Sequence, residues 1–142
     1  MADHVMHQIG EVADAVGLSL RTIRHYDEMG IVVPSGRSAG GFRLYTDGDI
    51  DRLRLVKRIK PLDFSLDEIR DMLRLLDAAD DDDGAARETG ERGDVGDRLT
   101  MYASLAVERC ERLREQLAAA SELTDTLTRT ARRLRGADAP RR

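Results

Sequence analysis

Hydrogen-bond donors gather in a short stretch near the start of the chain. Ser19 is suited to cap a helix, because its hydroxyl can accept from a free N–H of the first turn. Leu20 and Ile23 then fall on one side at helical spacing. The other sides carry donor-rich residues: Arg21, Thr22, Arg24 and His25. Base edges and phosphates in a DNA major groove offer mostly acceptors, which these donors suit, although an ordinary solvated amphipathic helix has the same pattern.

The residues just before this stretch predict another short helix. Apolar residues recur at positions 9, 12, 13 and 16, on one helical face. Gly17 then indicates a helix end, because glycine readily takes the left-handed conformation there. Two short helices joined by a turn of about three or four residues are typical of a helix-turn-helix unit, the alternative being an ordinary helical hairpin. The arginines on the second helix favour DNA binding.

A hairpin is predicted after the second helix. Gly40–Gly41 suits a tight turn that needs positive φ. The residues that follow alternate, so Arg43 and Tyr45 share one face and Phe42 lies on the other. We expect a small β wing from which Arg37 and Arg43 grip phosphates and Tyr45 donates its hydroxyl to one. The alternative is a solvated loop with a partly buried Phe42.

Two further helices should complete a DNA-binding domain over residues 8–76. Thr46 with Asp49 forms a variant of the capping box, and Ser65 with Glu68 forms a full one. Both helices have an apolar stripe that would pack on the first two: Ile50, Leu53, Leu55, Val56 and Ile59 in the third, then Leu66, Ile69, Met72, Leu73 and Leu76 in the fourth. Two basic residues of the third helix complete the DNA-binding candidates: Lys57 and Lys60.

Charge is unevenly distributed along the 142 residues. The chain is 41% hydrophobic, 35% charged and only 4% aromatic, as expected of a soluble, helix-rich protein. Its net charge of −4 argues against a general polyanion binder. Residues 21–60, however, hold nine basic and five acidic residues, whereas residues 77–97 hold nine acidic and two basic ones. This asymmetry predicts a local anion-binding surface followed by a segment that nucleic acid would repel.

The acidic segment, residues 77–97, is predicted to be a flexible linker. Four consecutive aspartates begin at Asp80, and glycines follow at positions 84, 90, 93 and 96. Such a cluster of carboxylates could hold a divalent cation, but nothing in the spacing defines a ligand geometry. A solvated linker is favoured, and neither a metal site nor a cofactor is expected.

A long helix is predicted over residues 98–135, capped by Asp97 and followed by a disordered tail at 136–142. At about 1.5 Å per residue it would be roughly 55 Å long, too long for four short helices to cover. We therefore expect a coiled coil between two copies of the chain rather than a helix folded back on its own domain. Its apolar residues alternate by four and three over about five heptads, the spacing of a coiled-coil seam: Leu99, Ala103, Ala106, Cys110, Leu113, Leu117, Ala120, Thr124, Leu127, Ala131 and Leu134.

Taken together, these motifs resemble the MerR family of bacterial transcription regulators. The matching segments are Ile9–Ala13, Gly17–Asp27, Gly41–Tyr45 and Phe64–Ile69, in the right order and followed by a long helix. The resemblance implies a winged helix-turn-helix dimer joined by an antiparallel coiled coil. It also implies a near-palindromic operator in promoter DNA with an over-long spacer, which the protein bends and untwists to realign the promoter for RNA polymerase.

The resemblance also assigns roles to single positions. Arg21, Thr22 and Arg24 match the contacts of the recognition helix. His25 and Tyr26 match the pair that holds the phosphate backbone, and a neutral imidazole at His25, where tyrosine is commoner, still donates one hydrogen bond. Other positions depart from the family pattern: Phe42, which is often tyrosine, and Pro61 and Asp63, which alter the turn between the third and fourth helices.

Several other functions find no support in the sequence. No nucleophile with a base, carboxylate pair or phosphate loop indicates an enzyme. We expect a cytoplasmic protein, because neither a membrane span nor a signal peptide is apparent. Metal- and redox-sensing members of the family carry clustered cysteines. This chain has one cysteine, Cys110, which we expect to be a buried structural thiol. The sequence therefore does not identify an effector. The alternative function is a protein-interaction module acting through the coiled coil, which would lack the steep salt dependence of DNA binding.

Overall fold

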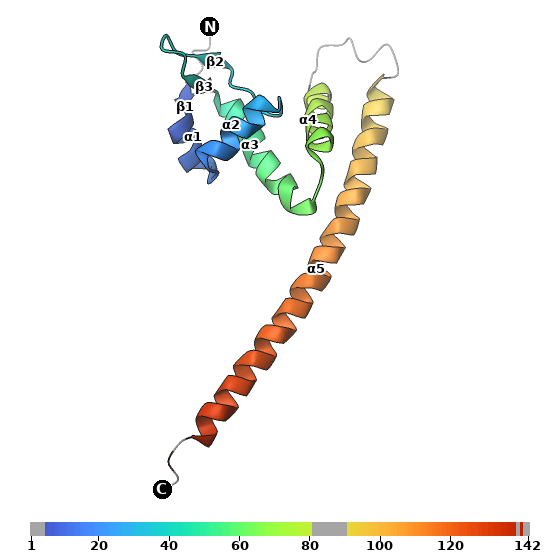
Figure 1. Ribbon diagram of the computed structural model, residues 1–142. Helices are drawn as coiled ribbons and strands as arrows, with labels where there is room; N and C mark the ends of the chain where they lie inside the picture. Colours follow the sequence, from blue (N-terminus) through green and yellow to red (C-terminus); the bar gives the residue numbers. More distant parts are fainter. Residues whose placement is uncertain (1–4, 81–90, 139, 141–142) are drawn as a thin grey trace. The chain divides into compact units, whose positions relative to one another are not determined.

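The computed structural model describes residues 5–80, 91–138 and 140. Helices make up most of this part of the chain, and three short strands lie near its start (Figure 1). Contacts divide the chain into two units, one ending at Tyr102 and the other beginning at Ala103. The mainly α-helical class, with a small β-sheet and a long C-terminal helix, agrees with the prediction.

The first two helices form the predicted helix-turn-helix. Helix α1 spans Ile9–Val16 and α2 spans Leu20–Glu28. Gly17, with a φ of 74°, ends α1 in the left-handed conformation, and its N–H donates to the Ala13 carbonyl. Ser19 caps α2 by accepting from the Thr22 N–H at 3.1 Å. Glycine and a serine cap therefore turn the chain within three residues.

The wing contains one strand more than the sequence indicated. β1 (His7–Gln8), β2 (Gly36–Arg37) and β3 (Arg43–Tyr45) form an antiparallel sheet in the order β1-β3-β2. β1 has only two residues, too few for the alternation of apolar and polar residues to indicate a strand. The His7 ring holds it in place through hydrogen bonds to Asp47 at 2.7 Å and to Glu11 at 3.4 Å. These two carboxylates, Asp47 foremost, raise the pKa of His7.

Helices α3 (Asp47–Ile59) and α4 (Leu66–Asp80) supply much of the core of the first unit. Both predicted capping boxes are present, one with Thr46 and Asp49 and the other with Ser65 and Glu68. Asp49 is also buried, and it accepts from the N–H and hydroxyl of Ser35. The predicted stripes face inward except at Leu76, which is 37% exposed, whereas Leu75 beside it is buried. The core combines these stripes with residues of α1, α2 and β3: Val12, Ile23, Tyr45, Leu53, Val56 and Leu73.

The turn between α3 and α4 contains the two residues that depart from the family pattern. A 3-10 turn, η1 (Lys60–Leu62), follows α3 directly, with Pro61 in its first turn, where a missing N–H costs nothing. Asp63 then takes a φ of +60°, the only non-glycine with positive φ among the residues described. This conformation reverses the chain and leads it through the buried Phe64 into α4.

Helix α5 spans Glu91–Ala137, which corrects three predictions. The predicted linker at 77–97 is helical at both ends, since α4 reaches Asp80, and residues 81–90 lie outside the described part. Asp97 lies within α5 rather than capping it, and Gly136 and Ala137, part of the predicted tail at 136–142, are the last residues of α5. Glycine costs only about 1 kcal/mol in a helix, which tertiary contacts can offset. Within the described residues, no helix is long and apolar enough to span a membrane.

Asp71 of α4 anchors the beginning of α5. Its carboxylate accepts from the Tyr102 hydroxyl at 2.7 Å and pairs with Arg98. The ring of Tyr102 packs edge-on against Phe64, with centroids 6.1 Å apart. Hydrogen bonding to Asp71 raises the pKa of Tyr102 to about 12, and the same contact lowers the pKa of Asp71. These contacts hold the glycine-containing start of α5 against α4 and Phe64. The periodicity of apolar residues does not indicate such polar contacts between helices.

Candidate nucleic-acid interface

Helix α2 directs its donors outward because its apolar side is fixed in the core. Ile23 and Tyr26 are buried, with 0% and 3% exposure. Arg21, Arg24 and His25 are exposed. Neither arginine forms a hydrogen bond or ion pair with any residue in the described ranges. Two cationic side chains and an imidazole are thus free to meet an external acceptor.

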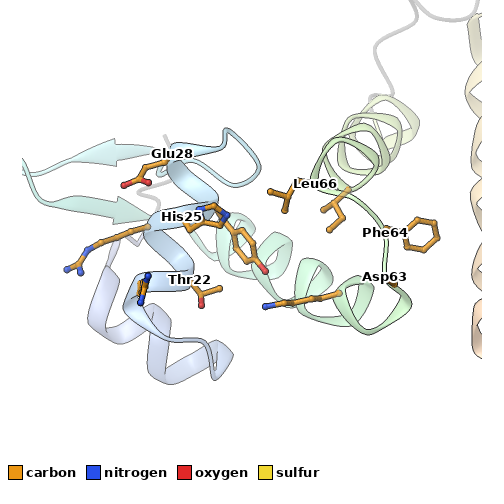
Figure 2. Close-up of a pocket in the computed structure, with 11 residues that line it drawn as sticks. Thr22, His25, Glu28, Asp63, Phe64 and Leu66 are labelled. Carbon is orange, nitrogen blue, oxygen red and sulfur yellow. The ribbon is translucent and has the colours of Figure 1, made fainter. Parts of the chain in front are cut away.

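A groove of about 1000 Å³ lies beside α2. In Figure 2, Thr22 and His25 of α2 lie on one side, and Phe64, which precedes α4, and Leu66, its first residue, lie on the other. Lys60 adds a third cation to those of α2, whereas Glu28 and Asp63 add carboxylates. Sequence reasoning missed the second wall, because helical periodicity does not say which helices face each other across an opening.

Tyr26 lines the same groove although its ring is buried. Burial raises the pKa of its hydroxyl, which therefore stays protonated at neutral pH. A neutral phenol is a hydrogen-bond donor, as contact with a phosphate oxygen requires. Ser19 and Thr22 add hydroxyls 2.8 Å apart at the start of the helix. The predicted contacts of α2 thus lie together on one side of the unit.

The wing is tied to α2 by a carboxylate. Asp27 accepts from Nε of Arg43 at 2.6 Å and lies 3.6 Å from Nη2 of Arg37. The hydrogen bond to Asp27 raises the pKa of Arg43. Arg37 also donates to the Gly41 carbonyl across the hairpin. Two arginines share one carboxylate, so the wing keeps a net positive charge while its position is fixed relative to α2.

The predicted phosphate contact of Tyr45 is wrong. Tyr45 has 0% exposure, and its hydroxyl is the one buried side-chain polar atom without a hydrogen-bond partner in the described part of the chain. Alternation separated Tyr45 from Phe42, but it could not show that α1 contacts β3 or that β1 pairs with β3, with His7 opposite Tyr45. Phe42, with 70% exposure, lies outside the core.

The two lysine candidates lie in different surroundings. Lys60 lines the groove beside α2. Lys57 instead donates from Nζ to the Val16 carbonyl at 2.9 Å, so its ammonium caps the end of α1. Positive charge at a helix C-terminus is stabilising, which gives Lys57 a structural role. The sequence could not distinguish these roles, because it predicts both lysines on the basic side of one helix, whereas Lys60 begins η1.

The predicted seam of α5 is uncovered in the single chain. Leu117 is 67% exposed and Leu134 is 60% exposed. Leu99, Ala106 and Cys110 are only partly exposed. The remaining seam residues of the second unit are exposed as well: Ala103, Leu113, Ala120, Thr124, Leu127 and Ala131. A continuous apolar stripe of this length, left in water, indicates a partner.

Comparison with known proteins gives a match at residues 8–76 to the family model described as MerR HTH family regulatory protein. Heavy metal-dependent transcription regulator 1 of Rhizobium meliloti is 31% identical over 133 residues, which cover 93% of this chain and 80% of that protein. The HTH-type transcriptional activator TipA of Streptomyces coelicolor is 43% identical over 67 residues. That match covers 47% of this chain and only 26% of TipA.

Solved structures show the same fold. The N-terminal part of MtaN, the Bacillus subtilis multidrug transporter activator, is 30% identical with a TM-score of 0.50, and the match covers 88% of this chain and 97% of that one. HiNmlR, described as a MerR family regulator lacking the sensor domain and bound to promoter DNA, has a TM-score of 0.60 at 23% identity. That match covers 95% of this chain and 94% of HiNmlR.

The unpartnered hydroxyl of Tyr45 generates a stability prediction. Tyr45→Phe removes a buried polar group that has no partner and should raise the free energy of unfolding by about 1 kcal/mol. Tyr102→Phe is the matched control, because it removes a hydroxyl bonded to Asp71 and should lower stability by about 1 kcal/mol. Urea denaturation measures both. A loss of stability in Tyr45→Phe would contradict the assignment of Tyr45 to the core.

Proposed function

Because the chain belongs to the MerR HTH family of regulatory proteins, we propose that it is a homodimeric regulator of transcription that binds an inverted-repeat operator in promoter DNA. The observation that carries this proposal is the outward face of α2, where Arg21 and Arg24 have no partner among the described residues. A protruding helix with free guanidinium groups fits the major groove, where guanine offers two acceptors to arginine.

The wing and the groove supply the contacts that hold the protein on the duplex. Arg37, Arg43 and Tyr26 donate to phosphate oxygens on either side of α2, and Lys60 adds charge along the groove. Such contacts fix the register of the protein without reading sequence. The Asp27 bridge supports this assignment, because it fixes the distance between the helix that reads bases and the wing that holds the backbone.

Two copies joined through α5 would present two recognition helices related by two-fold symmetry. A symmetric dimer reads an inverted repeat, with half-sites whose spacing follows the helical repeat of DNA. Binding bends and untwists the promoter DNA, and this deformation realigns the promoter for RNA polymerase. We place the protein in the cytoplasm and assign it no catalytic activity.

The heavy metal named for the Rhizobium meliloti relative is not carried over to this chain. The described residues contain no group of three His, Cys, Asp or Glu side chains able to hold a metal ion. The sequence has one cysteine, Cys110, which lies on the seam of α5. We propose promoter DNA, a second copy of this chain and RNA polymerase as its partners, and we assign it no effector.

Replacing the wing arginine tests the phosphate contact. Arg43→Ala should weaken binding to all duplexes equally, by roughly tenfold, and reduce the salt dependence by about one counterion, because phosphate contacts carry no sequence information. Fluorescence anisotropy over a salt series measures both quantities. Arg54→Ala, an exposed change on α3 outside the interface, is the control. A changed preference at one base pair without a general loss would contradict this role.

A charge in the seam tests the dimer. Leu117→Asp should convert the protein to a monomer and abolish operator binding, because a buried carboxylate has no partner there. Ala119→Asp is the control, since it adds the same charge two residues away and off the seam. Sedimentation velocity measures the oligomeric state of both variants. A Leu117→Asp protein that remains a dimer would refute the assignment of α5 as the dimerisation helix.

A further inference from the structure

Asp27 lies between α2 and the wing and pairs with two arginines at once. It belongs to the last turn of α2, and its side chain is only 14% exposed. Nε of Arg43, in β3, donates to Oδ2 of Asp27 at 2.6 Å. Nη2 of Arg37, in β2, lies 3.6 Å from the same oxygen. One carboxylate oxygen thus interacts with side chains from both strands of the hairpin.

The same two arginines are the proposed phosphate ligands of the wing. Carboxylate and phosphate oxygens are alternative acceptors for a guanidinium group, which binds both through the same N–H donors. The Nε donor of Arg43 is already bonded to Asp27, and the side chain of Arg43 is 23% exposed against 53% for Arg37. Asp27 is therefore an internal anion that competes with DNA for the cations of the wing.

This competition reduces the attraction of the wing for a duplex of any sequence. Binding without sequence preference depends on how many protein cations replace counterions on the phosphates. Asp27 neutralises part of the charge of Arg37 and Arg43 before DNA arrives. The wing therefore releases fewer counterions than two unpaired arginines would release.

The bond to Asp27 also fixes the direction of Arg43. β2 and β3 contain only two and three residues, so their ladder alone is a weak restraint on the wing. A guanidinium group has five N–H donors, and those on the Nη nitrogens of Arg43 can still meet a phosphate oxygen while Nε is held. Where α2 is seated on its bases, the phosphate beside the wing lies at one position. An Arg43 side chain that is already positioned then binds this phosphate without losing rotamer freedom.

Glu28 provides a comparison, because it follows Asp27 directly in α2. It is exposed and lines the groove beside α2. Its charge acts on Arg43, yet it forms no hydrogen bond or close ion pair with any residue in the described ranges. The two neighbours therefore have the same charge, and of the two only Asp27 holds the arginines of the wing.

We propose that Asp27 is a specificity-determining residue, which weakens binding of the wing to arbitrary DNA and positions Arg43 for the operator. This role rests on the proposed DNA binding and refines it, because it separates the affinity that any duplex receives from the affinity that only the operator receives. Discrimination between two partners increases when the wrong one is penalised as well as when the right one is attracted. Asp27 supplies the penalty as a competing anion, and it supplies the attraction by orienting Arg43.

Asp27→Asn tests this role, because it removes the charge and keeps the size of the side chain. A duplex of shuffled sequence should bind roughly fivefold more tightly, with a salt dependence steeper by about one counterion, because Arg37 and Arg43 are no longer neutralised. The duplex that the wild-type protein enriches from a random pool should gain nothing, because the loss of a positioned Arg43 offsets the freed charge. Fluorescence anisotropy over a salt series gives both affinities, and their ratio should fall by roughly fivefold.

Two further variants separate charge from position. Glu28→Gln removes the same charge from the next residue, so it should tighten binding to both duplexes by one common factor and leave their ratio unchanged. Asp27→Glu keeps the charge and should bind the shuffled duplex as the wild type does. Circular dichroism verifies the helix content of each variant.

The ratio of the two affinities decides the outcome. If both affinities of Asp27→Asn rise together, Asp27 contributes charge alone; if both fall together, it supports only the fold. Either result would overturn the specificity role and leave DNA binding by α2 intact. Tighter binding of the shuffled duplex by Asp27→Glu would overturn it too, even if Asp27→Asn did not fold. A wild-type protein that enriches no duplex from the pool would overturn the proposed function, and with it the role of Asp27.

Discussion

The ion pair between Asp27 and Arg43 is the interaction on which the DNA-facing side of this protein depends. It joins the last turn of α2 to the first residue of β3, so the helix proposed to read bases and the wing proposed to hold the backbone are linked directly. The wing has only three short strands and could not maintain this position through its ladder alone. Arg37 and Arg43 both pair with Asp27, so two positive charges face one negative charge and the wing stays positive enough to attract a phosphate.

Local chemistry made much of this fold predictable. Ser19, Thr46 and Ser65 each supply a cap that can be recognised from a few residues, and Gly17 supplies the stop between the first two helices. The outcome at Tyr45 could not be predicted in this way. Its burial depends on α1, which contacts β3, and on β1, which pairs with it, whereas alternation only separates two faces. Capping is local, and burial depends on the whole fold.

The candidate site was predictable on one side only. The outward positions of Arg21, Arg24 and His25 follow from the helical period, because Ile23 must be inside, although Tyr26 is buried beside it and Leu20, expected there, is 39% exposed. The opposite wall follows from the turn at Asp63, which leads into α4, and a separate contact, from Asp71 to Tyr102, fixes the start of α5 on α4. Periodicity did not reveal either contact, and for the same reason residues 77–80 and 91–97 were wrongly assigned to a linker. Tertiary partners outweighed the weak helix propensity of glycine and aspartate.

Selection of duplex DNA from a random pool by the purified protein tests the central claim most directly. Sequencing of the pool bound at moderate salt should show one enriched inverted repeat with a fixed distance between its halves, because two recognition helices related by two-fold symmetry read the same bases. Enrichment of a single half-site would contradict the dimeric arrangement. A pool without any enriched sequence would contradict operator reading by α2.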